Sequence, residues 1–282
     1  MQFKLSQLSP KKLDLHTHSS ASDGVLTPTE LILRAKEQQI DVLALTDHDT
    51  IDGIAEARSA AQQQQITLIS GVEISTLWNG KTIHIVGLDF DETHPAMTAL
   101  LAEQARLRHA RAVEIGEKFK KFGLENAFAE AQALTTGEVT RAHYARYLVN
   151  IGLVSNEGQA FKRYLSQGKP CHVKANWCDI PTAIDVIHQA GGVAVVAHPM
   201  RYQMTNNKIH TLIKDFQQWQ GDAVEIAGGI DHNQQKMLIK WLEELNLLAS
   251  VGSDFHYPCG WIELGKNLTI PTTVKAVWQQ SI

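Results

Sequence analysis

The sequence predicts an α/β fold built on a parallel sheet, open or closed. Short β-branched or apolar runs alternate with helical stretches before residue 95, and the alternation resumes after about residue 180. The 282 residues are 44% hydrophobic and 20% charged, which is ordinary globular composition. The length suits one large barrel or two modest domains.

In the first part of the chain, two helices are expected among four strands. The helix over 27–38 has Thr27 as its N-cap, Pro28 at its first position and Glu30 three residues after the cap. A second helix is expected over 51–64. The predicted strands cover 12–15, 42–46, 66–74 and 82–88.

From about Pro95 the alternation stops. Residues 97–122 carry apolar side chains at roughly helical spacing, Gly123 is placed to end that helix, and more helix is expected through about residue 165. We therefore predict one discontinuous α/β domain, formed by residues 1–95 and 176–282, with a helical insertion domain over 96–175.

After the insertion, the alternation predicts three more strands and two more helices. The strands are expected over 192–197, 223–227 and 248–252, and the helices over 180–190 and 234–245.

Charge is unevenly distributed along the chain. Residues 96–175 hold 12 Lys and Arg against 7 Asp and Glu, whereas the rest holds 14 against 23. A basic insertion is either a helical segment with a solvated cationic face or a cationic wall that faces an anionic substrate.

The sequence favours a cytoplasmic protein that does not enter a membrane. Residues 1–10 have no apolar core and do not resemble a secretory signal. The longest apolar run, about 193–197, is far below the roughly 20 residues that span a bilayer. Three cysteines, an odd number without a CxxC pattern, favour a reducing compartment.

Ionisable residues gather in or just after the predicted strands. His16 and His18 are two residues apart, so both imidazoles lie on one face of an extended segment. Such a pair alone is more often structural, but six strands deliver ligand-type residues, and the carboxyl ends of barrel strands open onto one face. We therefore predict a metal site from nine residues: His16, His18, Asp23, His48, Glu73, His84, His198, Asp254 and His256.

The ligand types restrict the metal. No thiolate belongs to the set, and imidazoles mixed with carboxylates suit Mn²⁺, Fe²⁺ or Zn²⁺ better than Mg²⁺. Nine candidates exceed what one ion can hold, so two or three divalent cations are expected, with Glu73 bridging. Ions roughly 3.5–4 Å apart can generate hydroxide at neutral pH and clamp both oxygens of an in-line phosphoryl displacement. The expected chemistry is hydrolysis by a metal-activated hydroxide, without a protein nucleophile.

These motifs resemble, in order, those of the polymerase and histidinol phosphatase (PHP) family, over roughly 12–95 and 176–257. The resemblance implies a distorted (β/α)₇ barrel that holds up to three divalent ions, often manganese. The matching motifs are His16-x-His18, Asp23, Thr46-Asp47-His48, Gly71-x-Glu73, His84, His198-Pro199 and Asp254-x-His256.

The resemblance also implies how the ligands are shared among three ions. One ion is expected on His16, His18, Glu73 and Asp254; a second on Asp23, His48 and His256; and a third on Glu73, His84 and His198.

The insertion, with Arg-Leu-Arg-His-Ala-Arg at 106–111, and the strings at 140–143 and 198–202 resemble one subgroup of that family. Its members are 3′,5′-nucleoside bisphosphate phosphatases, some of which also trim short RNA as 5′-to-3′ exoribonucleases. The second phosphate of such a substrate needs a cation, for which Arg201 and Arg141 are candidates. Arg201 could instead hold its loop by a salt bridge. Asp47 and Asp49 could orient ligands or cap the following helix.

Three alternatives remain open from the sequence. The chain could be a phosphatase of another small metabolite, such as histidinol phosphate. It could be an amidohydrolase, which the lack of a clear carboxylated-lysine position and the presence of Glu73 and Asp23 disfavour. It could also be a non-catalytic PHP module that binds metal for stability or docks to a polymerase.

Overall fold

The computed structural model describes residues 5, 8, 12–259 and 262–279. Most of residues 1–10, for which the sequence predicts no secretory signal, lie outside the described residues. Eight of the described strands form one curled sheet; seven follow one another in order, and the short β5 (Cys178–Asp179) pairs with Thr76 and Leu77 near the end of β3. Their order in the sheet is β1 (Leu13–Asp14), β2 (Val42–Leu45), β3 (Thr67–Trp78), β4 (Lys81–Leu88), β6 (Val193–Val196), β7 (Ala223–Glu225) and β8 (Leu248–Ser250).

Strand β4 departs from the predicted parallel sheet. It runs antiparallel to both β3 and β6, whereas the other neighbours on the path are parallel. The cause is the short turn at Asn79 and Gly80, whose φ angles of 48° and 75° are those of a tight hairpin, too short for a parallel crossover. The amino-terminal half of β4 therefore lies at the edge where the parallel strands end, and His84 pairs with Ser75 there.

The segments that follow β1 and β8 close the sheet. The amide of Leu15 donates to Val251 O over 3.2 Å, and the amide of His18 donates to Phe255 O over 2.9 Å. Gly252 makes this approach possible, because a Cβ added there would lie 2.1 Å from Cβ of His16. The strands thus form the distorted barrel that the sequence predicts.

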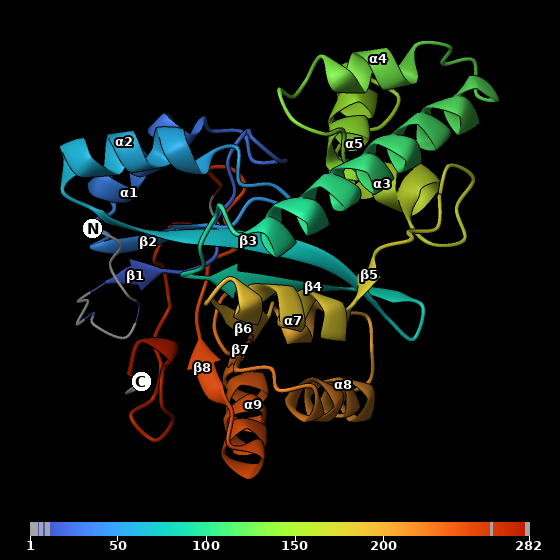
Figure 1. Ribbon diagram of the computed structural model, residues 1–282. Helices are drawn as coiled ribbons and strands as arrows, with labels where there is room; N and C mark the ends of the chain where they lie inside the picture. Colours follow the sequence, from blue (N-terminus) through green and yellow to red (C-terminus); the bar gives the residue numbers. More distant parts are fainter. Residues whose placement is uncertain (1–4, 6–7, 9–11, 260–261, 280–282) are drawn as a thin grey trace.

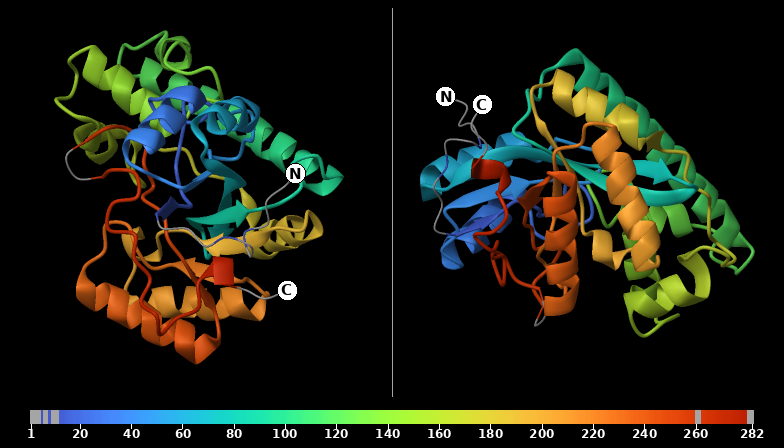
Figure 2. Two further views of the ribbon diagram at one scale, coloured as in Figure 1. Left: turned by 90° about the vertical axis from the view of Figure 1, so that its left-hand side faces the viewer. Right: turned by 90° about the horizontal axis from the view of Figure 1, so that it is seen from below.

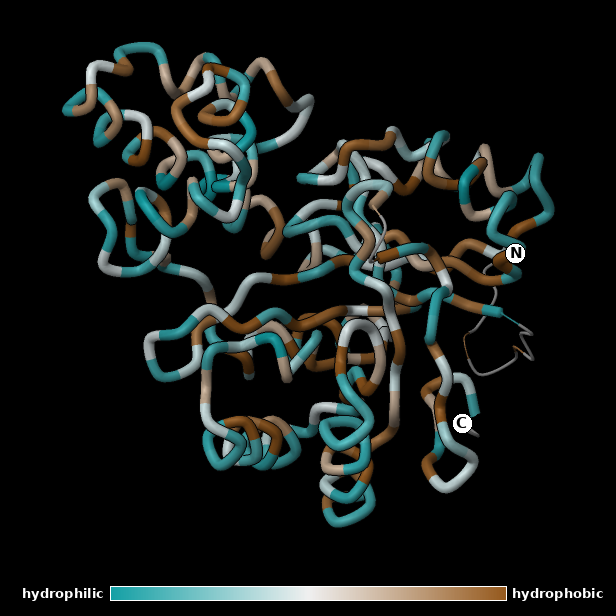
Figure 3. The backbone as a smooth tube through the Cα atoms, turned by 180° about the vertical axis from the view of Figure 1, so that it is seen from behind, coloured by the Kyte–Doolittle hydropathy of each residue, from teal (hydrophilic) through white to brown (hydrophobic). Residues whose placement is uncertain are grey.

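Helices cover the outside of the sheet. Figures 1 and 2 show α1 (Pro28–Glu37) and α2 (Ile54–Gln64) on one side, and α7 (Ile180–Gln189), α8 (Asn206–Gln218) and α9 (His232–Leu245) on the other. The capping box of α1 is confirmed: Thr27 accepts from the amide of Glu30, whose carboxylate accepts from the amide of Thr27. Helix α8 was not predicted. Figure 3 shows hydrophobic residues along the central strands and hydrophilic residues on turns of the outer helices.

The segment between β4 and β5 is helical, as predicted. Its elements are α3 (Pro95–Lys120), α4 (Ala127–Gln132), α5 (Arg141–Asn150), α6 (Glu157–Ala160) and the π-helical η2 (Phe161–Leu165). Figure 1 shows α3, α4 and α5 rising beside the barrel. Apolar side chains from Ala112 to Val173 form their own core, whereas Met97 and Leu101 pack in the barrel core. We propose residues 96–175 as an insertion unit that shares the start of α3 with the barrel.

Candidate metal centre

The nine predicted ligands meet at the edge of the sheet where the parallel strands end. Three overlapping groups of their side chains bring ligand atoms within 4.8 Å of one another. The groups are His16, His18, Glu73 and Asp254; His18, Asp23, His48 and His256; and His48, Glu73 and His84.

The first group surrounds the end of β1. Nε2 of His16 and Nε2 of His18 are 3.1 Å apart. Oε2 of Glu73 lies 3.3 and 3.2 Å from these two nitrogens, and Oδ1 of Asp254 lies 3.4 and 3.1 Å from them. These four residues are the ones that the family resemblance assigns to one ion.

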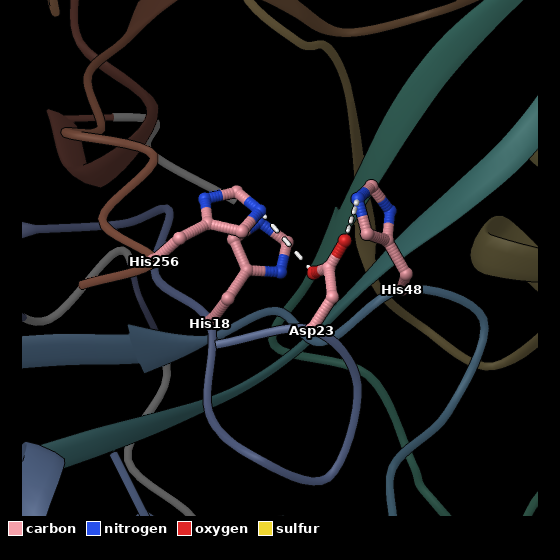
Figure 4. Close-up of side chains that lie close together, drawn as sticks. All are labelled: His18, Asp23, His48 and His256. Atoms are coloured by element: carbon pink, nitrogen blue, oxygen red, sulfur yellow. Dashed lines mark ion pairs between the residues drawn. The ribbon is translucent and has the colours of Figure 1, made fainter. Parts of the chain in front are cut away.

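In the second group, Asp23 lies between two imidazoles. Figure 4 shows its carboxylate between His256 and His48, with His18 beside His256. Oδ1 of Asp23 is 3.2 Å from Nε2 of His256, and Oδ2 is 3.9 Å from Nε2 of His48. His18, which the resemblance assigns only to the first ion, also belongs to this group.

Glu73 is the centre of the third group. Its Oε1 lies 2.8 Å from Nδ1 of His84 and 3.0 Å from Nε2 of His198, and its Oε2 lies 2.9 Å from Nδ1 of His48. Both oxygens thus face imidazoles, and Glu73 belongs to two of the three groups. His198 contacts Glu73 but is not among the three residues whose ligand atoms converge here, a place that His48 takes.

Backbone pairing fixes these side chains. Residues 47–49 run parallel to β3, where the amide of Glu73 donates to Asp47 O and the amide of Asp49 donates to Glu73 O, so His48 lies beside Glu73. His198 and Asp254 adopt positive φ angles of 29° and 55°. Non-glycine residues rarely adopt this conformation, and functional sites are where such strain is usually retained.

The donor set fits cations. Within the described residues, Oδ1 of Asp23, Oε2 of Glu73 and Nδ1 of His48 and of His84 are buried without a hydrogen bond, although each lies 3.3 Å or less from another member of the cluster. Atoms that converge on a shared point without bonding to each other are arranged as ligands. Buried polar atoms of this kind are costly unless a partner binds them.

Electrostatics keep the carboxylates charged. Burial alone would raise the pKa of Glu73, but the imidazoles of His48, His84 and His16 hold it well below the usual range. Burial alone would lower the pKa of His18, yet Asp254 and Glu73 raise it to about 10. For His48 burial prevails and lowers the pKa to about 4. Imidazolium groups here stabilise the carboxylates, as bound cations would.

Glu225 is a site residue that the sequence analysis missed. It ends β7, and its carboxylate contacts the ring of His16 and the backbone of His198. Its position in the sequence could have indicated this role, because Glu225 stands in one of the predicted strands, and the other candidate ligands lie in or just after such strands.

Asp47 and Asp49 hold the loops around the cluster and cap no helix, since the cap of α2 is Gly53, without a side-chain bond. Asp47 accepts from Ser19 and Ser22, in the loop that carries Asp23.

Asp49 ties the insertion to the barrel. Its Oδ2 accepts from Nε of Arg108 over 2.6 Å, and its Oδ1 accepts from the Ser75 amide and the Gln104 side chain. Arg108 also lies over the ring of Trp177. The long helix α3 is thereby fixed next to His48.

Arg201 lies beside the cluster and pairs with a predicted ligand. Its Nη1 donates to Oδ2 of Asp254, and its Nη2 donates to the carbonyl oxygens of Gly228 and Ser253. The loop salt bridge that the sequence left open therefore exists in the structure. It orients Asp254 so that Oδ1 faces the histidines.

Three guanidinium groups face the cluster across a pocket of about 100 Å³. Burial and the neighbouring Arg141 and Arg108 lower the pKa of Arg111 to about 9, and burial and Arg108 lower that of Arg141. Arg108 is neutralised by Asp49, whereas no carboxylate pairs with Arg111 or Arg141 among the described residues. The lining residues include Asp23, His48, His84, Arg108, Arg111, Arg141, Phe161 and Trp177.

None of the helices in the described ranges is long and apolar enough to cross a lipid bilayer.

Comparisons with known proteins agree with this geometry. The chain is 62% identical to a 5′-3′ exoribonuclease of Haemophilus influenzae over 271 residues, 96% of this chain and 99% of the relative. It is 39% identical to a 3′,5′-nucleoside bisphosphate phosphatase of Chromobacterium violaceum, over 95% of each chain. A solved structure described as an amidohydrolase from the same species, with bound sulfate and no metal, superposes with a TM-score of 0.89 at 38% identity and covers 95% of each chain.

A model of the PHP domain matches residues 14–167, more than half of the chain. The match contains all five of the predicted metal motifs that precede the insertion and extends through most of the insertion itself. The resemblance inferred from the sequence is thus confirmed, and the chain belongs to the PHP domain family.

Proposed function

We propose that this protein is a metal-dependent phosphoesterase that removes the 3′-phosphate of nucleoside 3′,5′-bisphosphates, and that the same centre shortens RNA from its 5′ end. The observation that carries the proposal is the juxtaposition of a carboxylate–imidazole cluster with Arg111 and Arg141, two half-buried cations that pair with no carboxylate among the described residues, across one small pocket. Two relatives support the proposal: one is named as an exoribonuclease, the other as a bisphosphate phosphatase, and each aligns with nearly the whole chain.

The two halves of the site suit two phosphates. The cluster is the place for the phosphate that reacts, and the guanidinium groups of Arg111 and Arg141 are the place for the one that does not, since such groups bind phosphate through paired N–H donors. The rings of Phe161 and Trp177, each beneath an arginine, line the same pocket and offer apolar surface toward the nucleoside.

One reaction accounts for both substrates. In each, water attacks the phosphorus bonded to O3′ of the nucleotide whose 5′-phosphate is held by the arginines. The P–O3′ bond breaks and O3′ leaves with a proton. A bisphosphate then gives the 5′-nucleotide and inorganic phosphate, whereas RNA gives the 5′-nucleotide and a shorter RNA with a new 5′-phosphate.

The nine residues predicted from the sequence are proposed to hold two or three divalent ions, with Glu73 bridging and manganese as the first candidate among Mn²⁺, Fe²⁺, Zn²⁺ and Mg²⁺. Such ions acidify water and neutralise charge on phosphoryl oxygens. The chain itself positions the phosphate between the cluster and the arginines. We also propose a cytoplasmic location, which the free state of the three cysteines supports.

The test is a substrate panel with added Mn²⁺. Adenosine 3′,5′-bisphosphate should be hydrolysed far more efficiently than adenosine 3′-monophosphate, because only the former reaches the arginines. RNA with a 5′-phosphate should be degraded faster than the same RNA with a 5′-hydroxyl. Failure to act on the bisphosphate and on 5′-phosphorylated RNA would refute the proposal.

The alternatives explain less. A phosphatase of a single-phosphate metabolite such as histidinol phosphate leaves Arg111 and Arg141 without a ligand. An amidohydrolase, the name given to the structural relative, would use these guanidinium groups only for a substrate that carries an anionic group. A non-catalytic module that binds metal for stability could retain the nine ligand-type residues, but it leaves Arg111 and Arg141 beside them without a role. The panel should therefore include histidinol phosphate and an N-acyl amino acid as negative substrates.

A further inference from the structure

Glu225 links two of the proposed metal ligands through one buried carboxylate. It is 3% exposed at the end of β7. Its Oε1 lies 2.7 Å from Nδ1 of His16, and its Oε2 accepts from the backbone amide of His198 over 2.7 Å. We propose that Glu225 is a positioning residue that fixes both ligands and so couples two ion positions. The inference rests on the metal centre of the proposed function.

The bond to His16 sets which ring nitrogen is free. A neutral imidazole carries one proton, and a carboxylate at Nδ1 holds the proton there. Nε2 then presents its lone pair toward Oε2 of Glu73 and Oδ1 of Asp254, which lie 3.3 and 3.4 Å away. In the other tautomer, Nε2 would carry a proton and could not bind an ion.

The bond to His198 holds a strained backbone. His198 has φ 29° and ψ 55°, a conformation that is unfavourable for residues with a β-carbon, and it precedes Pro199. With its amide fixed by Glu225, its ring stacks on that of His16 and its Nε2 reaches Oε1 of Glu73 at 3.0 Å. Without that acceptor, the amide would be left unpaired beside buried groups, and the backbone would relax away from Glu73.

Both oxygens of Glu225 are engaged in these two bonds, and Glu225 is absent from the three convergent groups found among the described residues. It therefore acts through its neighbours.

The opposite end of β7 offers a matched control. Asp222 also accepts from one imidazole, Nε2 of His188 at 2.8 Å, and one backbone amide, that of Ala194 at 2.8 Å. In both cases the amide bond links β7 to β6 or to the residues that follow it, whereas the imidazole comes from α7 for Asp222 and from the segment after β1 for Glu225. Asp222 belongs to none of the convergent groups found among the described residues. Loss of either carboxylate should weaken packing, but only loss of Glu225 should affect ions.

The experiment compares Glu225→Gln and Asp222→Asn with the wild-type protein. Each is stripped with chelator and titrated with Zn²⁺ alone, and affinity and stoichiometry are read by calorimetry and metal analysis. We expect zinc affinity to fall about 10- to 100-fold in Glu225→Gln, the usual effect of losing a partner of a metal-binding histidine, or one equivalent to be lost. Asp222→Asn should bind like the wild type. Wild-type affinity and stoichiometry in Glu225→Gln would overturn the inference, as would an equal loss in both variants.

A second readout needs no variant. In zinc-loaded wild-type protein, nitrogen–proton correlation spectra should show His16 protonated at Nδ1, and protonation at Nε2 would overturn the proposal even if Glu225→Gln fails to fold. A wild-type protein that binds no zinc, manganese or iron would instead overturn the metal centre of the proposed function, and this inference with it.

Discussion

Nε2 of His16 and Nε2 of His18 lie 3.1 Å apart and share the same two carboxylate neighbours, Glu73 and Asp254. Neighbouring residues of an extended strand point to opposite faces, so Thr17 between them points away and donates its hydroxyl to Ala44 O. Two imidazole nitrogens held this close, both facing two carboxylates, would be stabilised by a cation bound among them.

Metal should therefore stabilise the fold as well as serve chemistry. At a free Mn²⁺ concentration 100 times the dissociation constant, we expect the free energy of unfolding to rise by about 2.7 kcal/mol for each independent site. Urea unfolding with Mn²⁺ and with chelator measures the difference. His18→Ala should remove most of it, because His18 belongs to two of the three groups. Identical unfolding curves with and without metal would contradict this prediction.

His48 is expected to be essential for activity and dispensable for folding. It belongs to two ligand groups, and 12% of its side chain is exposed. His48→Ala should lower kcat by at least about 100-fold, since loss of an outer partner of a ligand already costs 10- to 100-fold. The exposed His109, which pairs with Glu138 at 3.4 Å, is the control. Steady-state kinetics at saturating Mn²⁺, with circular dichroism for folding, test the prediction. Full activity in His48→Ala would rule out the site.

Arg141 should contribute to the recognition of the second phosphate. Arg141→Ala should raise KM for adenosine 3′,5′-bisphosphate by roughly 10- to 150-fold, the equivalent of a hydrogen bond to a charged group worth about 1.5–3 kcal/mol. Hydrolysis of adenosine 3′-monophosphate should be unchanged, since that substrate lacks the 5′-phosphate. Arg163→Ala, at an exposed arginine of the same insertion, is the control for net charge. Equal losses on both substrates would argue against this role.

The sequence predicted the fold and the nine candidate ligands because their signals are local. A strand followed by His-x-His, or the Thr27 capping box, needs no knowledge of distant residues. It did not predict the reversal of β4, although Asn79-Gly80 carried that signal, because the prediction followed the strand–helix rhythm instead of the turn chemistry.

The contacts that cross the barrel were beyond sequence reasoning. The bond between Glu225 and His16 joins residues 209 positions apart, and that between Arg108 and Asp49 joins residues 59 apart. The sequence left Arg201 open as a phosphate partner or as a loop salt bridge, and only the three-dimensional arrangement of the β7 and β8 loops shows its guanidinium paired with Asp254. The metal assignment itself stays a prediction.

His188 gives a pH dependence that is separate from the metal centre. Its hydrogen bond to Asp222 raises the pKa of the imidazole above the ordinary 6.5, against the opposing effect of burial. A raised folded-state pKa means that protonated His188 stabilises the fold fully below about pH 6.5, and that this contribution is lost as pH rises through the folded-state pKa. The gain of wild type over His188→Gln in chelator should therefore be larger at pH 5.5 than at pH 8.5. Urea unfolding at the two pH values tests the sign, and a gain that grows with pH would contradict it.

Gly252 allows the barrel to close next to the metal centre. A Cβ there would lie 2.1 Å from Cβ of His16 and 2.9 Å from its amide nitrogen, so Gly252→Ala must push the end of β8 away from β1. Overpacking of this kind costs about 1–3 kcal/mol, and the shift should also weaken metal binding, because Asp254 donates its amide to His16 O across this contact. Gly123→Ala is the control: its φ is +75° with open space around it, so it should lower stability through backbone strain alone and leave metal affinity unchanged. Urea unfolding and Zn²⁺ titration of the two variants separate these effects, and equal metal affinities would show that closure at Gly252 does not position His16.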